Sequence, residues 1–182
     1  MVGILKDMEL LQFPDERLRR VSEPVDNFDK DLKLLSKEML KVMYQSNGIG
    51  LAAPQVNKTI RMIVLDVSEK RNEPMVLVNP RLEKAEGSVD SSEGCLSVPE
   101  IRTTVRRYKQ IELFAQNVDG SEIRMEADDL LSICIQHEID HLDGKLFIDY
   151  VPSVKLQRLK KKIAKQKKLS SQKPQGTSVS IV

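Results

Sequence analysis

The residues most able to do chemistry lie in one short stretch, His137–His141, with the sequence HEIDH. It falls within the mostly apolar run 130–142, which predicts a helix. Residues four apart share one face of a helix, so both imidazoles can bind a single metal ion. Glu138 follows the first histidine, close enough to reach a water at such an ion and handle its proton. The chain has two histidines, both in this stretch, which therefore indicates a hydrolytic metal site.

A metal ion held by two histidines needs at least one further protein ligand. The candidates are Cys95, Cys134 and a carboxylate. Cys134 lies in the apolar run 133–135, a pattern that favours a small buried hydrophobic residue. Cys95 lies in the extended, Gly-flanked segment 91–99, where its thiolate can project freely. Cys95 is therefore the better ligand candidate, with a half-buried strand cysteine as the alternative.

Helices that would position these residues can be read from apolar periodicity. A first helix is expected over 29–46, ended by Asn47-Gly48. Its apolar face comprises Leu32, Leu35, Met39, Val42 and Met43. The helix of the histidine motif is expected to begin at Asp128 or Asp129 and to end before Gly144. A third helix is expected from Pro152 to Lys168.

Strands are expected where β-rich runs lie between breakers, at 60–67 and 75–79. Residues 103–126 alternate in hydrophobicity, with a hairpin turn at 117–120. The expected fold class is α+β. Mostly antiparallel strands pack around a central motif-bearing helix, with an N-terminal helix and a basic C-terminal helix.

Length and composition point to one catalytic domain over residues 1–168, in which 152–168 form the basic helix. The polar residues 169–182 are expected to be disordered. With 31% charged and 4% aromatic residues, the composition suits a soluble protein. No apolar run is long enough to span a bilayer, and the N-terminus lacks a signal-peptide pattern. A cytoplasmic location without membrane contact is therefore expected.

Charge is distributed unevenly along the chain. Residues 151–182 hold nine Lys or Arg and no acid, so residues 1–150 hold 20 bases against 27 acids. The basic segment 155–168 also carries three apolar residues at helical spacing: Leu156, Leu159 and Ile163. Such a helix could bind phosphates by counterion release, or be a solvated face packed on the body.

Three motifs together resemble the signature motifs of the peptide deformylase family, in the family's order and with similar spacing. They are GIGLAAPQ at 48–55, EGCLS at 93–97 and QHEIDHL at 136–142. The stretch PDERL at 14–18 also resembles the family's N-terminal part, so the resemblance covers roughly residues 10–165. An HExxH stretch alone has many unrelated carriers, and the first motif alone would fit a Gly-rich turn. The combination is specific.

The resemblance implies that Cys95, His137 and His141 bind one divalent metal ion. A thiolate and two neutral imidazoles leave a coordination position open for water. The family's usual metal is ferrous iron, Fe2+. Imidazole and thiolate accept several divalent ions, so Zn2+, Ni2+ and Co2+ are expected substitutes.

The resemblance also implies roles in catalysis. Glu138 would take a proton from the attacking water and deliver one to the departing amine. The oxyanion of the tetrahedral intermediate needs preorganised donors, which would be the side-chain amide of Gln55 and the backbone N–H of Leu96. Gly50 and Gly94 would let the main chain approach the substrate closely.

By the same resemblance, the substrate is the N-formyl-methionine of newly made polypeptides, which yields formate and a free amino terminus. The implied substrate-binding residues are Ile49, Gly50, Glu93, Gly94, Leu130, Ile133, Cys134 and His137. Arg102 resembles a family residue near the substrate backbone, although an ordinary surface arginine fits its position equally well. Asp140 would be either a partner of the metal ligands or a helix-surface carboxylate.

The resemblance implies one further partner, the ribosome, on which the basic C-terminal helix would dock near the peptide exit; no DNA partner is expected. Two alternatives remain to be weighed. An HExxH zinc endopeptidase usually takes its third ligand downstream, and no third histidine exists here. A non-catalytic ribosome-binding protein with a structural metal would not require Glu138 or Gln55.

Overall fold

The computed structural model describes residues 8–152, 154–157 and 161. The chain divides into two compact units, 1–147 and 148–182. The first contains every helix and strand that carries a motif. The prediction of a single domain over 1–168 stays a prediction.

In the second unit, residues 154–157 and 161 are helical, and the backbone N–H of Leu156 donates to the carbonyl of Pro152 at 3.0 Å. The rest of the basic helix expected over 152–168 lies outside the described residues. So do residues 169–182, for which disorder was expected.

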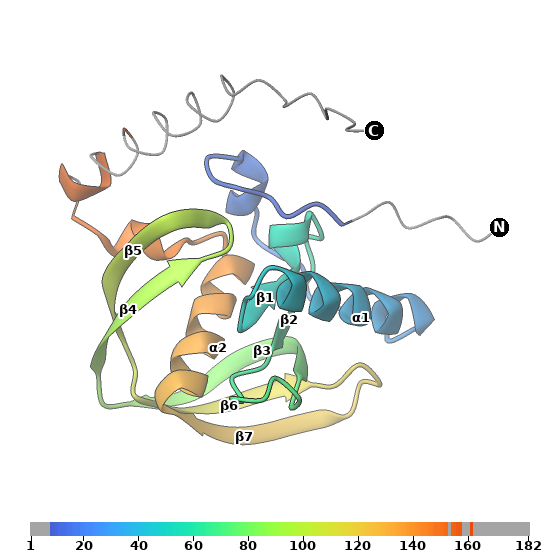
Figure 1. Cartoon of the computed structure of the whole chain (residues 1–182). Helices are drawn as coiled ribbons and strands as arrows, with labels where there is room; N and C mark the ends of the chain where they lie inside the picture. The colour runs from blue at the N-terminus through green and yellow to red at the C-terminus, as the bar shows by residue number, and fades with distance from the viewer. Residues whose placement is uncertain (1–7, 153, 158–160, 162–182) are drawn as a thin grey trace, which may run out of the picture. The chain divides into compact units, whose positions relative to one another are not determined.

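The first unit is built on two antiparallel sheets (Figure 1). The larger sheet has five strands in the order β1-β2-β3-β6-β7, formed by Gly50–Ala52, Met62–Leu65, Met75–Glu86, Gln110–Gln116 and Glu122–Asp128. The smaller sheet is a hairpin of β4 (Val89–Cys95) and β5 (Val98–Arg107). Helix α1 spans Lys30–Gln45, and helix α2 spans Asp129–Leu142. Short 3-10 helices lie at Glu16–Arg19, Ala53–Val56 and Phe147–Tyr150.

Strand β2 shows how the larger sheet separates the two helices. Successive side chains of a strand point to opposite faces. Met62 and Val64 accordingly pack in one apolar cluster with Met39 and Met43 of α1. The intervening Ile63 and Leu65 pack in another cluster with residues of α2. Helix α2 is thus central, between the larger sheet and the β4–β5 hairpin (Figure 1), and the predicted α+β fold is confirmed.

Both predicted helix starts are confirmed. The Asp29 carboxylate caps α1 by accepting from the backbone N–H groups of Asp31 and Leu32, each at 2.9 Å. Asp128 is the N-cap of α2, although its side chain makes no capping hydrogen bond. The hairpin turn at 117–120 is also confirmed, because the N–H of Gly120 donates to the carbonyl of Asn117 at 3.0 Å.

Some strand boundaries differ from those expected. Strand β3 runs on to Glu86, beyond the expected end at Asn79. Residues 81–84 are all exposed and mostly charged, so no apolar alternation marks this part of the strand. Strand β5 begins at Val98 and pairs with β4 in its own sheet. The three residues of β1 are too few to show periodicity in a Gly-rich stretch. In the described part of the chain, no helix has the length and apolarity to cross a membrane.

Gly144, just beyond α2, provides a test of how this helix ends. Its φ is +71°, and a Cβ there would lie 2.5 Å from the carbonyl oxygen of Arg19. Gly144→Ala should therefore combine the strain of a left-handed backbone with a clash against main chain. We expect it to lower the free energy of unfolding, measured by urea denaturation, by about 1–3 kcal/mol more than the matched variant below.

Gly87→Ala is that matched variant. Gly87 has a φ of +64°, but the nearest atom to its added Cβ is the Cβ of Lys109, at 3.3 Å. It shares the backbone strain without the main-chain clash. If both variants lose the same free energy of unfolding, the contact with Arg19 does not add to the cost of the Gly144 substitution.

Candidate active site

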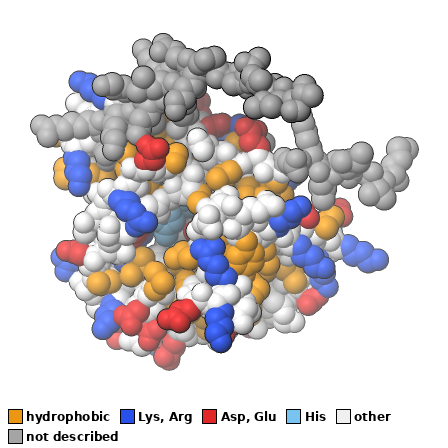
Figure 2. Space-filling view, in the orientation of Figure 1, with side chains coloured by type: hydrophobic (Ala, Val, Ile, Leu, Met, Phe, Trp, Pro, Cys, Tyr) orange, Lys and Arg blue, Asp and Glu red, His pale blue; other side chains and the backbone are white. Residues whose placement is uncertain are grey.

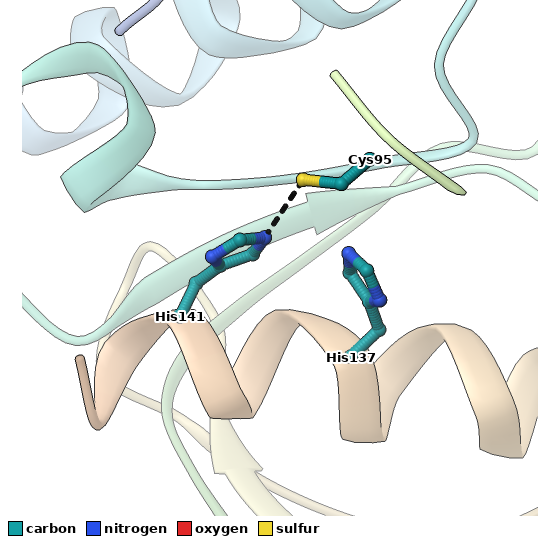
Figure 3. A group of neighbouring side chains, drawn as sticks. All are labelled: Cys95, His137 and His141. Atoms are coloured by element: carbon teal, nitrogen blue, oxygen red, sulfur yellow. Dashed lines mark hydrogen bonds between the residues drawn. The ribbon is translucent and has the colours of Figure 1, made fainter. Parts of the chain in front are cut away.

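The structure brings the three predicted metal ligands together (Figure 3). His137 and His141 project from the same side of α2, and Cys95 is the last residue of β4. Their ligand atoms all lie within 4.8 Å of one another. The Cys95 Sγ is 3.2 Å from the Nε2 of His141. Elements more than forty positions apart in sequence thus converge on one point.

The donor set fits a metal ion. The Nδ1 of His141 and the Oε2 of Glu138 are buried without a hydrogen-bond partner among the described residues. Burial holds the pKa of His141 well below its usual value, so its imidazole is neutral and has a lone pair to donate. One sulfur and two imidazole nitrogens at this separation could hold a metal ion, and three protein ligands with one open position are typical of a catalytic metal site.

Cys134 lies outside this group. Its side chain is 5% exposed, and its Sγ is 3.6 Å from the carbonyl oxygen of Ile49. Burial, and then the charges of Glu138 and Glu93, raise the pKa of this thiol well above its usual value. It stays a neutral thiol, as the apolar run around it predicted.

A buried ion-pair network orients His137. The Nε and Nη2 of Arg107 donate to the two oxygens of Glu93 at 2.7 and 2.9 Å. The Nη1 of Arg107 donates to Asp140 at 2.6 Å. The second oxygen of Glu93 is also 2.8 Å from the Nδ1 of His137. All four side chains are buried, so the network joins the β4–β5 hairpin to α2.

The charge state of Glu93 fixes the tautomer of His137. Burial alone would raise the pKa of Glu93, but hydrogen bonds from Arg107 and His137 outweigh it and hold that pKa below its usual value. An ionised carboxylate can only accept, so the Nδ1 of His137 carries a proton. The lone pair of a neutral His137 is then on Nε2, as a ligand requires.

Glu138 is the residue predicted to transfer protons. Its side chain is 4% exposed, and it lines the cavity described below. Burial raises its pKa to about 7, opposed by His137 and reinforced by Glu93. A Cβ on Gly50 would collide with the Oε1 of Glu138, so the glycine permits a close approach of strand β1 to this carboxylate.

A cavity of about 570 Å³ opens over these residues. In Figure 2 a pale-blue histidine surface is visible at the bottom of a recess. The sequence-predicted catalytic and substrate-binding residues all line it: Ile49, Gly50, Gln55, Glu93, Gly94, Leu96, Arg102, Leu130, Ile133, Cys134, His137 and Glu138. Arg102 is exposed and lies over Gly94 at the rim. His141 is not part of the lining and lies behind it.

Gln55 has a fixed orientation next to Cys95. Its Oε1 accepts from the backbone N–H of Ala52 at 2.8 Å. Its Nε2 donates to the hydroxyl of Ser97 at 3.0 Å and approaches the Sγ of Cys95 at 3.5 Å. Because the carbonyl end is bound to the main chain, the NH2 end of the amide faces the site.

Arg107 is the site residue that the sequence analysis missed. One signal was available, because Thr103, Val105 and Arg107 alternate along β5 and share its buried face. A buried arginine requires acidic partners, and these are Glu93 and Asp140. Asp140 is therefore not a helix-surface carboxylate: its side chain is 12% exposed and is bound to Arg107.

Taken together, a cysteine and two histidines around one point, with a buried carboxylate beside an open cavity, define a metallohydrolase type of site. Comparison with known proteins agrees with this class. The family model described as Polypeptide deformylase matches residues 7–157. The chain is 51% identical over 163 residues to the peptide deformylase of Pseudoalteromonas translucida, covering 90% of this chain and 98% of that protein. The chain is 46% identical to the peptide deformylase of Nitrosococcus oceani, again covering 90% of this chain and 98% of that protein.

Solved structures of peptide deformylases have the same fold as this chain. The crystal structure of a peptide deformylase from Legionella pneumophila has a TM-score of 0.87 and 38% identity, covering 93% of this chain and all of that one. The peptide deformylase from Synechococcus elongatus, in complex with actinonin, has a TM-score of 0.82 and 37% identity, covering 88% and 90%. The chain belongs to the peptide deformylase family.

The ligand assignment can be tested by metal content. Cys95→Ser replaces a thiolate with a hydroxyl that binds divalent metals poorly at neutral pH. We expect the purified variant to retain less than about a tenth of the metal of the parent protein by elemental analysis. Cys134→Ser is the matched control and should keep its metal. An equal loss of metal in the two variants would refute the assignment of Cys95, and not Cys134, as a ligand.

Proposed function

We propose that this protein removes the formyl group from the N-terminal formyl-methionine of newly synthesised polypeptides, releasing formate and a free amino terminus. One observation carries the proposal: Cys95, His137 and His141 converge next to Glu138 at the bottom of an open cavity. Membership of the peptide deformylase family supports it. The family depends on a metal, and this site holds a candidate set of ligands.

The metal we propose is Fe2+, with Zn2+, Ni2+ or Co2+ as substitutes. The Sγ of Cys95 and the imidazole nitrogens of His137 and His141 would hold it. When bound, a divalent ion supplies Lewis acidity at the formyl oxygen and at the attacking water. A mixed sulfur and nitrogen donor set suits each of these ions.

In the proposed mechanism, Glu138 moves the protons. A carboxyl group whose pKa is about 7 is divided between its two protonation states near neutral pH, which suits a group that accepts a proton and returns it. Its Oε2 makes no hydrogen bond within the described chain, so it is available to the water that attacks the formyl carbon. The same carboxyl group then protonates the departing amine.

The oxyanion formed at the formyl carbon would be stabilised by fixed donors. We assign this role to the Nε2 of Gln55, whose amide is oriented by Ala52, and to the backbone N–H of Leu96. The methionine side chain would lie against Ile133 and Cys134 in the apolar part of the cavity. An unbranched thioether adapts well to such a surface.

Neither alternative explains the site as well. An HExxH endopeptidase usually takes its third ligand downstream of the motif, whereas the third candidate here, Cys95, lies upstream on the β4–β5 hairpin. A purely structural metal would not need the unpartnered carboxylate of Glu138 at a cavity wall.

Glu138→Gln tests the proposed chemistry. The amide keeps the size of the side chain but cannot accept a proton. We expect kcat for formate release from formyl-Met-Ala-Ser, by anaerobically purified iron-loaded protein, to fall by about 10²–10⁴-fold. Metal content should be unchanged. Glu126→Gln, an exposed position on β7, is the control for the substitution itself. An active Glu138→Gln variant, or hydrolysis of internal peptide bonds instead, would refute the assignment.

We further propose that the enzyme acts in the cytoplasm at the ribosome, where formylated chains emerge, and that its basic C-terminal segment makes the contact. Residues 151–182 hold nine Lys or Arg and no acid, so they can displace counterions from RNA phosphates.

Removing residues 153–182 should therefore weaken co-sedimentation with ribosomes, while formate release from formyl-Met-Ala-Ser stays within about twofold. A full-length variant with the eight basic residues of 155–168 changed to Gln separates the effect of charge from that of length. It should bind ribosomes as weakly as the truncated chain, and its binding should depend less on salt concentration than that of the parent protein. Undiminished binding by both variants would rule out this contact.

A further inference from the structure

One buried carboxylate is not used in the mechanism above. Asp66 follows β2, and its side chain is 1% exposed. Burying a charge is costly unless hydrogen bonds compensate. Here the carboxylate accepts from the hydroxyls of Tyr44 and Ser68, each at 2.6 Å, and from the backbone N–H groups of Ser68 and Glu73 at 3.0 and 3.2 Å. It is therefore fully bound, and it holds parts of three segments together.

Charge and burial make these bonds persistent. Burial alone would raise the pKa of Asp66, but the hydrogen bonds from Ser68 and Tyr44 outweigh it and leave that pKa below its usual value. Burial, and then the bond to Asp66, raise the pKa of Tyr44 to about 12. Tyr44 thus remains a donor and Asp66 an acceptor across the neutral range, as a charge-assisted hydrogen bond requires.

The segments joined by Asp66 surround one wall of the cavity. We call the residues Asn47–Gly50 the substrate wall, because all four line the cavity. Tyr44 lies in the last turn of α1, immediately before this wall. The loop after Asp66 reaches the wall too, because the Nη2 of Arg71 donates to the carbonyl of Asn47 at 3.1 Å. The backbone N–H of Asp66 itself donates to the carbonyl of Ile49 at 2.8 Å.

The backbone conformation and the close contacts of the substrate wall restrict its movement. Asn47 has a φ of +57°, a conformation that needs support from its surroundings. A Cβ on Gly48 would lie 2.7 Å from the side chain of Leu96, so the wall passes closely by the residue after Cys95. Gly50, by contrast, is held separately by its pairing with Leu65. The contacts of Asp66 and of the loop after it therefore add to the helix-end hydrogen bonds of Asn47 and Gly48 in holding the part of the wall over 47–49.

We propose that Asp66 is a positioning residue for the substrate: by holding Tyr44 and the following loop, its carboxylate fixes the substrate wall and so sets the affinity for the formyl peptide. This inference rests on the proposed deformylase function. Ile49 is 37% exposed at the cavity and presents an apolar side chain to an incoming methionine. None of the three metal ligands is bonded to Asp66. Loosening the wall should thus weaken binding and leave the metal in place.

The test compares Asp66→Asn and Tyr44→Phe with the parent protein, all metal-loaded and full length. With formyl-Met-Ala-Ser, we expect KM to rise about 5–20-fold in Asp66→Asn and about 2–5-fold in Tyr44→Phe, with kcat within about twofold. The dissociation constant of the product peptide Met-Ala-Ser, measured by calorimetry, should rise by the same factors. Metal content should match the parent.

Two further variants make the outcome decisive. Asp26→Asn makes the same chemical change at an exposed site and should leave KM unchanged. Arg71→Gln removes the contact to Asn47 without altering Asp66, and it should raise KM in the same direction. If Asp66→Asn does not fold, Tyr44→Phe and Arg71→Gln decide, since each leaves the carboxylate with its other partners.

Unchanged KM and product affinity in folded variants, or a fall in kcat or metal content with KM unchanged, would overturn the inference. A parent protein that releases no formate would instead refute the proposed function.

Discussion

The buried ion pairs of Arg107 are the interaction on which the rest of the site depends. Cys95 belongs to a hairpin that forms its own sheet, whereas both histidines belong to α2. Arg107 on that hairpin binds Asp140, one residue before His141, and Glu93, two residues before Cys95. Removing one member of such a buried set leaves an uncompensated charge. The spacing between sulfur and imidazole nitrogens is therefore set by electrostatics as well as by apolar packing.

The same network would also favour the binding of a divalent cation at this site. Glu93 and Asp140 carry two negative charges against the single positive charge of Arg107, and all three are buried. A Cys95 thiolate adds one more negative charge, which gives the set a net charge of minus two. Burying uncompensated charge is costly in a medium of low dielectric constant. A divalent cation held by Cys95 and the histidines would neutralise this excess, so folding energetics and metal binding would favour the same arrangement.

Sequence patterns predicted the elements whose stabilising contacts lie close together in the chain. They did not predict the contacts between residues that are far apart in the chain. Helix α2 could be predicted because its caps and apolar run lie within the seventeen residues 128–144, and histidines four apart must share a face. The ion pairs of Arg107 join positions 93, 107 and 140, and no local pattern encodes such pairing. The alternation along β5 predicts that Arg107 is buried, but it does not predict which acidic residues Arg107 binds. The outer half of β3 was missed because its residues are mostly exposed and charged and show no apolar period.

The candidate metal ligands and the proposed substrate wall are supported by different parts of the fold. Charged side chains between the hairpin and α2 hold the candidate ligands, whereas the part of the wall over 47–49 is contacted by Asp66 and the loop after it, at the junction of α1 and β2. The two systems meet where Gly48 passes Leu96 and Gly50 passes Glu138. A side chain at either glycine would separate the surfaces by the width of a methyl group, and misplacement of about 1 Å can cost a large part of the rate. The glycines of the first motif are therefore required less for flexibility than for the closeness with which two independently supported halves of the site must fit.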